Sequence, residues 1–314
     1  MRVDIIENAV IVPPGSGQQR PRSGVFDADG QFVPTSATVL SHGKAPPPPK
    51  WAAPQAAIEG THLYAGLGRR HFGHYLLESA TRFWALPAHP AQGVMYADRP
   101  GPPKWLGKGP KAELHALLSG DLPSALIRVP TLVERLIVPA QGFGHGALIT
   151  GTAPFLGHVR PLLQRFETGE SPRLYISRAR LQPHQQVHRE LEIEERLEAA
   201  GYGILRPERV SLAEQCSAYR TAKVILGGDG SAFHLAAMVM RPDAKVGIIL
   251  RRNRPEMLTR LATQIEGFAG VRAEGFDLRE PIRVQKRWGT YKTAAPVPLR
   301  HERLFADLRE AGFL

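Results

Sequence analysis

The chain has 314 residues, of which 43% are apolar and 22% charged, and its formal net charge is +11 at pH 7. This apolar fraction can build packed cores, and the length suits two domains, which excludes a disordered or collagen-like chain. No apolar stretch reaches the roughly 18–20 residues of a membrane-spanning helix. The N-terminus lacks the apolar stretch of a secretory signal. The single cysteine, Cys216, cannot form a disulfide within the chain, which agrees with a cytoplasmic location.

The excess of Lys and Arg points to an anionic partner such as nucleic acid, lipid headgroups or a phosphorylated small molecule. Solubility alone is the alternative explanation. The basic residues are spread along the chain, and no helix-turn-helix, zinc-finger, RRM or KH signature is present. A phosphate-bearing ligand or an anionic membrane surface is therefore favoured over nucleic acid.

The first half is predicted as strands and turns followed by alternating strands and helices. A short strand at 10–12 and a hairpin turn at 27–30 come first, and the prolines at 46–49 predict a stiff connector. The strands predicted next are 61–65, 93–97, 125–129 and 132–138, and the helices are 71–86, 110–118 and 152–166.

The second half alternates more regularly. Its predicted strands are 173–177, 203–205, 223–226 and 245–250, and its predicted helices are 186–200, 212–221, 231–240, 255–265 and 301–312. Ser211 and Glu214 form a capping box that marks one helix start. Short apolar strands separated by helices favour parallel βαβ units, so this half should be Rossmann-like. We expect an N-terminal domain at 1–168, a second domain at 169–290, and a C-terminal segment at 291–314 that packs back on the first.

Titratable residues recur at helical spacing in the segment 71–86. His71, His74, Glu78 and Arg82 are separated by three, four and four residues, which places them on one stripe of a helix between apolar faces. Enclosure and neighbouring cationic groups tune a carboxylate for general base catalysis. The alternatives are a solvated stripe in which Glu78 pairs with Arg82, and a metal site of His71, His74 and Glu78, whose spacing matches no familiar zinc motif.

A glycine-rich turn, 227–231, separates a predicted strand from a helix. The N–H groups at the helix N-terminus, together with Ser231, could hold a phosphate, and Gly228 and Gly230 would permit its close approach. Phe233 stands where a Rossmann fingerprint has its third glycine, which disfavours NAD. The alternative is a tight turn that needs glycine for its geometry alone.

Two polar side chains, Asp229 and His234, lie in or just after this glycine-rich turn, and His145 and Cys216 lie elsewhere in the chain. Asp229 should point away from a phosphate, and His234 either reaches the same ligand or is a satisfied core histidine. His145 is best interpreted as part of a plain glycine-flanked turn, and Cys216 as a small core residue.

Arg178 and Arg180 follow the strand 173–177 at its carboxyl end. Ligands bind at this edge of open α/β sheets, so both arginines would meet the crevice at the glycine turn. Two guanidinium groups and a helix N-terminus can neutralise a diphosphate without a metal.

With these segments in view, the chain resembles glycosyltransferase family 61, whose bacterial members are often described as capsular polysaccharide biosynthesis proteins. The resemblance rests on four segments that occur in the family's order: 71–82, 174–178, 211–215 and 227–232. It implies an α/β, GT-B-like fold with two Rossmann-like domains facing a cleft, an inverting mechanism and no required metal. Asp229 stands where the family often carries His.

The resemblance implies that the first domain holds the acceptor and the base, and the second a nucleotide sugar, expected to be UDP-linked. On this hypothesis Glu78 takes the proton of the acceptor hydroxyl, and His74 positions it or serves as the base instead. The candidate catalytic residues are thus Glu78, His74 and Arg82. The candidate donor-binding residues are Arg178, Arg180, Glu214, Gly228, Asp229, Gly230, Ser231 and His234.

The acceptor is expected to be a glycan or a lipid-linked molecule of surface polysaccharide biosynthesis. The positive charge fits peripheral contact with the anionic inner face of the membrane. Two alternatives stay open: a non-catalytic nucleotide-sugar or carbohydrate-binding protein of the same fold, and a metal-dependent hydrolase that uses His71, His74 and Glu78. Donor turnover separates the first from an enzyme, and loss of activity on chelation would indicate the second.

Overall fold

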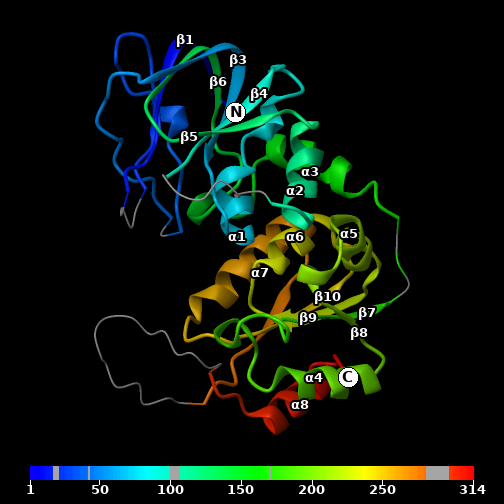
Figure 1. The fold of residues 1–314 in the computed structure, drawn as a ribbon. Coiled ribbons are helices and arrows are strands. Elements are labelled where there is room, and N and C mark those ends of the chain that lie inside the picture. The colour runs from blue at the N-terminus through cyan, green and yellow to red at the C-terminus, as the bar shows by residue number, and fades with distance from the viewer. Residues whose placement is uncertain (17–20, 42, 100–106, 168, 170, 281–296) are drawn as a thin grey trace. The chain divides into compact units, whose positions relative to one another are not determined.

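The computed structural model describes residues 1–16, 21–41, 43–99, 107–167, 169, 171–280 and 297–314 (Figure 1). The chain divides into two compact units, Met1–Leu162 and Leu163–Leu314. Both units combine helices with a sheet that contains parallel strands, so the expected α/β class is confirmed. None of the described helices is long and apolar enough to cross a membrane.

The first unit is built on a six-stranded sheet of order β2-β1-β6-β3-β4-β5. Strands β6, β3, β4 and β5 run parallel, whereas β1 and β2 are antiparallel to their neighbours. The chain winds from β3 to β5 on one side of β3 and then places β6 on the other. The strands are β1 (Val3–Val12), β2 (Gly24–Phe26), β3 (Ala56–Leu67), β4 (Gly93–Ala97), β5 (Ser124–Ile127) and β6 (Thr131–Pro139).

The helices of this unit include α2 (Pro110–Ser119) and α3 (Ala153–Leu163), close to their predicted bounds. The helix predicted at 71–86 is wrong in its form. It is broken into α1 (Phe72–His74), a π-helical turn at Tyr75–Ser79 and a 3-10 turn at Phe83–Ala85. The N–H of Ala80 bonds to the carbonyl of Tyr75, five residues back, and this wider turn interrupts the 3.6-residue period.

The second unit has five parallel strands in the order β11-β10-β9-β7-β8, which confirms the expected parallel sheet. The strands are β7 (Arg173–Ile176), β8 (Gly203–Leu205), β9 (Val224–Gly228), β10 (Lys245–Ile249) and the unpredicted β11 (Ala273–Phe276). The helices are α4 (Glu190–Ala199), α5 (Leu212–Thr221), α6 (Ala232–Val239), α7 (Glu256–Ala269) and α8 (His301–Glu310). Helices α5, α6 and α7 cover one face, and α4 and α8 the other (Figure 1).

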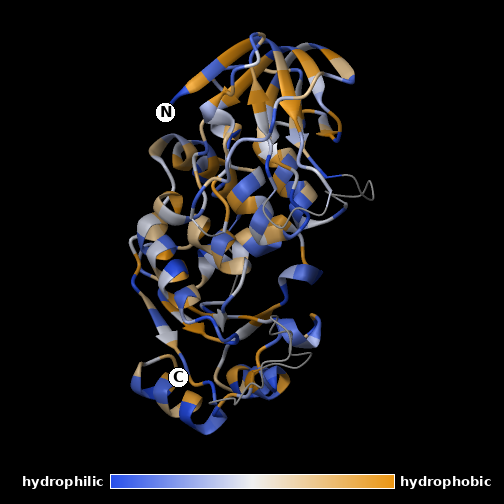
Figure 2. Cartoon of the chain, turned by 90° about the vertical axis from the view of Figure 1, so that its left-hand side faces the viewer, coloured by the Kyte–Doolittle hydropathy of each residue, from blue (hydrophilic) through white to orange (hydrophobic). Residues whose placement is uncertain are grey.

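Both sheets bury apolar strands, which carry much of the orange in Figure 2. In the first unit, Ile11, Tyr64 and Val133 belong to one buried cluster. In the second, Leu304 and Phe305 of α8 join a cluster that includes Leu226 of β9. Helix α8 therefore packs on the second sheet, on the face that α4 also covers (Figure 1). The packing of the C-terminal segment on the first domain stays a prediction.

Candidate active site

Glu78 lies where the winding of the first sheet reverses. The segment that carries it follows β3, and the loop that carries His145 follows the neighbouring parallel strand β6. Between two such strands the connections leave in opposite directions, and ligands of open α/β sheets bind in the crevice at this point. The fold thus brings Glu78 and His145 together although 67 residues separate them.

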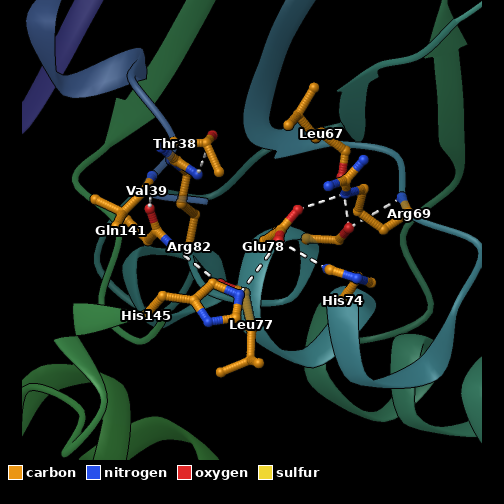
Figure 3. Close-up of polar contacts among 11 residues, drawn as sticks. Thr38, Val39, Leu67, Arg69, His74, Leu77, Glu78, Arg82, Gln141 and His145 are labelled. Atoms are coloured by element: carbon orange, nitrogen blue, oxygen red, sulfur yellow. Dashed lines mark hydrogen bonds and ion pairs between the residues drawn. The ribbon is translucent and has the colours of Figure 1, made fainter. Parts of the chain in front are cut away.

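Three side chains hold the carboxylate of Glu78 (Figure 3). Its Oε1 atom lies 2.8 Å from Nδ1 of His74 and 3.3 Å from Nε2 of His145. Its Oε2 atom accepts a hydrogen bond from Nε of Arg69. Burial alone would raise the pKa of Glu78, but the hydrogen bonds from His145 and His74 and the positive charges beside it hold that pKa well below its usual range. The carboxylate is therefore a fixed negative charge.

Exposure separates the three members of this group. The side chain of Glu78 is fully buried, that of His145 is 11% exposed and that of His74 is 40% exposed. A substrate can therefore reach the imidazole of His74 more readily than the carboxylate behind it. When Nδ1 of His74 donates to Glu78, its Nε2 carries the lone pair that can accept a proton. The geometry is that of an imidazole base oriented by a buried acid.

The same group is also a candidate cation site. The donor atoms of His74, Glu78 and His145 all lie within 4.8 Å of one another. His145 thus stands where the sequence suggested His71, whose ring packs against His74 with centroids 5.6 Å apart. The guanidinium of Arg69 already neutralises the carboxylate, and a cation would displace both imidazole hydrogen bonds from Oε1. The residues present therefore fit the hydrogen-bonded arrangement better.

The loop of His145, interpreted from sequence as a plain turn, is held by a buried glutamine. Gln141 accepts a hydrogen bond from the N–H of Val39 at 2.7 Å and donates to the carbonyls of Leu77 and Phe143. A Cβ on Gly144 would lie 2.4 Å from Nε2 of Gln141, so a larger residue there would have to displace this amide. The sequence feature that could have indicated a role for His145 is its position just beyond the carboxyl end of a parallel strand.

Arg82 does not share a face with Glu78, contrary to expectation. Its side chain is fully buried and points toward Thr38 (Figure 3), and it donates to the carbonyls of Pro139 at 2.9 Å and Ala37 at 2.7 Å. Burial lowers the pKa of Arg82 to about 10, so it stays charged at neutral pH. A Cβ on Gly66, where φ is +90°, would lie 2.6 Å from this guanidinium. These hydrogen bonds tie separate segments of the first unit together, which favours a structural role for Arg82 over the catalytic role predicted from the sequence.

The second unit has a corresponding reversal between β7 and β9. Arg178 follows β7, and its Nε atom donates to the carbonyl of Gln185 at 2.7 Å. A Cβ on Gly230 would lie 2.5 Å from Nη1 of Arg178. The structure thus brings Arg178 to the glycine turn as expected, but the glycine makes room for this arginine side chain.

Asp229 points at two arginines that the sequence analysis did not single out. Its Oδ1 atom accepts a hydrogen bond from the N–H of Arg251 at 2.8 Å, and its Oδ2 atom accepts one from Nη2 of Arg252 at 2.8 Å. Asp229 is fully buried. Arg251 and Arg252 follow β10 as Arg178 follows β7, and this shared position after a parallel strand was the signal that could have found them.

The other candidates in this unit lie as follows. His234 is buried with its Nδ1 atom 2.5 Å from Oε1 of Gln264, which fits the core-histidine alternative. Glu214 closes the predicted capping box by accepting the N–H of Ser211 at 2.7 Å. Arg180 is exposed in the turn after β7. Ser231 and Gly228 flank the turn at the start of α6 and the end of β9.

Comparison with protein-family models matches residues 72–247 to Glycosyltransferase 61. No match to a curated protein was found. The matched region covers more than half of the chain and runs from α1 into β10, so it includes Glu78, His145 and the glycine turn. The family transfers a glycosyl group from a donor to an acceptor. This chain therefore belongs to the glycosyltransferase 61 family.

Proposed function

We propose that His74 is the base of an inverting glycosyl transfer and that Glu78 orients it. The observation that carries this proposal is the hydrogen bond between a part-exposed imidazole and a fully buried carboxylate, 2.8 Å long. The expectation that Glu78 itself takes the proton is less well supported, because a carboxylate with a lowered pKa is a weak base and this one is covered by its partners.

The reaction is a single displacement. The acceptor hydroxyl gives its proton to Nε2 of His74 as its oxygen bonds to the anomeric carbon, and the bond from that carbon to the diphosphate breaks on the opposite side. The buried charge of Glu78 stabilises the imidazolium that forms. The configuration at the anomeric carbon inverts because one displacement occurs.

The donor is proposed to be a nucleotide sugar, with UDP as the expected nucleotide, held by the second unit. Arg178 and the N–H groups at the start of α6 lie at the carboxyl edge of the parallel sheet, where such ligands bind. Fixed guanidinium groups offset the charge that develops on the leaving diphosphate, which supports a metal-independent mechanism. The GT-B arrangement expected from the sequence would let the two units serve one reaction.

The acceptor is proposed to be a glycan or lipid-linked molecule of surface polysaccharide biosynthesis, of the bacterial capsular type. The net charge of +11 supports an anionic acceptor and work at the inner face of the membrane.

Two linked measurements test the proposal. Thermal unfolding is recorded with UDP, GDP, CMP, dTDP and ADP, each with and without EDTA, because a ligand of the folded state raises the melting temperature. Nucleotide release from the matching nucleotide sugar is then followed for the wild type and for H74Q. The proposal expects one selective stabilisation that survives EDTA, and release that H74Q abolishes. Binding without release would indicate a non-catalytic protein, and release lost with EDTA would indicate the metal alternative.

A further inference from the structure

Three arginines surround the glycine turn of the second unit. Arg178 follows β7, Arg251 and Arg252 follow β10, and the turn at the end of β9 lies between them. A Cβ on Gly228 would lie 3.5 Å from Cδ of Arg178 and 3.5 Å from Cδ of Arg251, so the stems of these two arginines flank the glycine. The two strands that flank β9 thus bring three positive side chains to the turn that follows β9.

The cluster carries more positive charge than the carboxylate in contact with it can neutralise. Asp229 pairs with Arg252 through Oδ2, whereas Nε of Arg251 is 3.8 Å from Oδ1 and donates instead to the Asp229 carbonyl at 2.7 Å. The nearby carboxylate of Glu190 accepts hydrogen bonds from the backbone N–H groups of Arg178 and Val187 and from the hydroxyl of Tyr175. Among the described residues, the Asp229 carboxylate is thus the ion-pair partner of Arg251 and Arg252, while Arg178 donates through Nε to the carbonyl of Gln185 and is influenced by Glu190, Asp229 and Glu208 through their charge.

This excess charge is largely removed from water. The side chain of Arg251 is 4% exposed, and Arg178 is also buried. Burial, together with the charge of Arg178, lowers the pKa of Arg251 to about 9, so it remains protonated at neutral pH but at a cost in free energy. An anion of two or more charges placed against the cluster would recover that cost.

We propose that Arg251 and Arg252 act with Arg178 to bind the diphosphate of the donor, and that Asp229 is a positioning residue that holds these arginines and does not touch the ligand. The inference rests on the proposed function and deepens it. Arg251 and Arg252 lie outside the region 72–247 that matches the family, so the match does not assign them a role. The side chain of Arg252 is 34% exposed, so it can meet a ligand while Asp229 anchors it from behind.

The test is calorimetric titration of the full chain with inorganic pyrophosphate in EDTA. Each of R251M and R252Q should weaken binding about tenfold or more, because each removes a charge-assisted hydrogen-bond donor. The matched control is R241Q: Arg241 is also paired with an aspartate, Asp243, but lies before the amino end of β10. It should bind pyrophosphate as the wild type does.

Asp229→Asn tests the positioning role, because the two possible roles of Asp229 predict opposite changes in the affinity for pyrophosphate. If Asp229 only adds negative charge near the ligand, D229N should tighten pyrophosphate binding. If it holds Arg252 and Arg251, binding should weaken although a negative charge has been removed, and the loss should be smaller when R252Q is already present. A melting curve of each variant reports whether it is folded. If R251M does not fold, R252Q still tests the inference, because the side chain of Arg252 is part-exposed.

The inference is overturned if the wild type does not bind pyrophosphate, or if R251M and folded R252Q bind it equally well. Nucleotide release by the wild type is measured separately. Release with arginine-independent pyrophosphate binding would refute the arginine site and leave the proposed function intact. Arginine-dependent binding without any release would support the anion site and count against the proposed transfer.

Discussion

The Nδ1 atom of His74 lies 2.8 Å from Oε1 of Glu78, four residues later in the chain. His74 directly precedes the π-helical turn Tyr75–Ser79 and Glu78 lies within it; the carboxylate is fully buried, whereas the imidazole is 40% exposed. This division supports the roles proposed for the two groups, in which the imidazole exchanges a proton with the substrate and the carboxylate stabilises the charge that results.

Removing the imidazole should therefore remove the base. We expect H74G to lower the rate of nucleotide release by about 10²–10⁴-fold, the usual contribution of general base catalysis. Imidazole added to the buffer should restore part of the activity of H74G and none of the activity of E78Q, because only H74G keeps the carboxylate that orients an added base. Steady-state rates with and without imidazole measure this.

The control is H71Q, since His71 is exposed and its ring lies beside His74. It should change the rate little and should not respond to imidazole. An H74G enzyme that keeps most of its activity would contradict the role of His74 and return the base to Glu78.

Arg82 should contribute to stability and not to the reaction. We expect R82K to lower the free energy of unfolding by about 2–4 kcal/mol. The planar guanidinium reaches the carbonyls of Pro139 and Ala37 through two separate nitrogens, Nε and Nη2, and the compact ammonium of lysine lacks this spread, so a buried acceptor loses its donor. Urea unfolding measures the change. At a temperature where R82K is folded, its rate per folded molecule should match the wild type, and a rate loss like that of E78Q would contradict this interpretation.

Arg82 and His145 were both placed wrongly by the sequence analysis: Arg82 was predicted beside Glu78 and His145 in a plain turn. Hydrophobic patterning predicted strands such as β4 at 93–97, and the spacing of Ser211 and Glu214 predicted the capping box, since both features depend on residues close in sequence. A uniform helical period was then assumed through 71–86, and the π-helical turn, stabilised by contacts such as Ser79 with the carbonyl of Leu67, removed Arg82 from the predicted face.

Contacts that depend on the order of strands in a sheet could not be predicted from residues close in sequence. His145 reaches Glu78 because β6 pairs with β3, and Arg251 reaches Asp229 because β10 pairs with β9. Arg178 was predicted correctly at the glycine turn since the carboxyl edge of a parallel sheet was used as a guide. Applied to every strand end, the same rule would have indicated His145 and Arg251 as well.

His115 should make the first unit less stable in weak acid. Its side chain is buried in α2, where its Nδ1 atom lies 3.2 Å from the Tyr96 hydroxyl and 3.3 Å from that of Tyr75. Burial lowers its pKa from 6.5 to about 4, so the unfolded chain binds the proton more readily. The contribution is complete above pH 6.5 and is lost as the pH falls toward 4.

Urea unfolding of the wild type and H115N at pH 7, 6 and 5 measures this effect. The free energies of unfolding of the two proteins should converge as the pH falls, because asparagine does not titrate. Parallel curves across this range would show that the histidine is solvated in the folded chain or that another group dominates.

Glu78 should produce a second loss of stability at lower pH. Hydrogen bonds from His145 and His74 and the charge of Arg69 hold its folded pKa well below the ordinary 4.5, against the effect of burial. Because the folded pKa is the lower one, the stabilisation is complete above pH 4.5 and is lost as the pH falls below it. E78Q should therefore be less stable than the wild type at pH 7 and should approach it between pH 4.5 and 3. If the difference in free energy of unfolding between E78Q and the wild type stays constant over that range, the three partners do not hold the carboxylate ionised. The same result would count against the role of Glu78 in stabilising a charged His74.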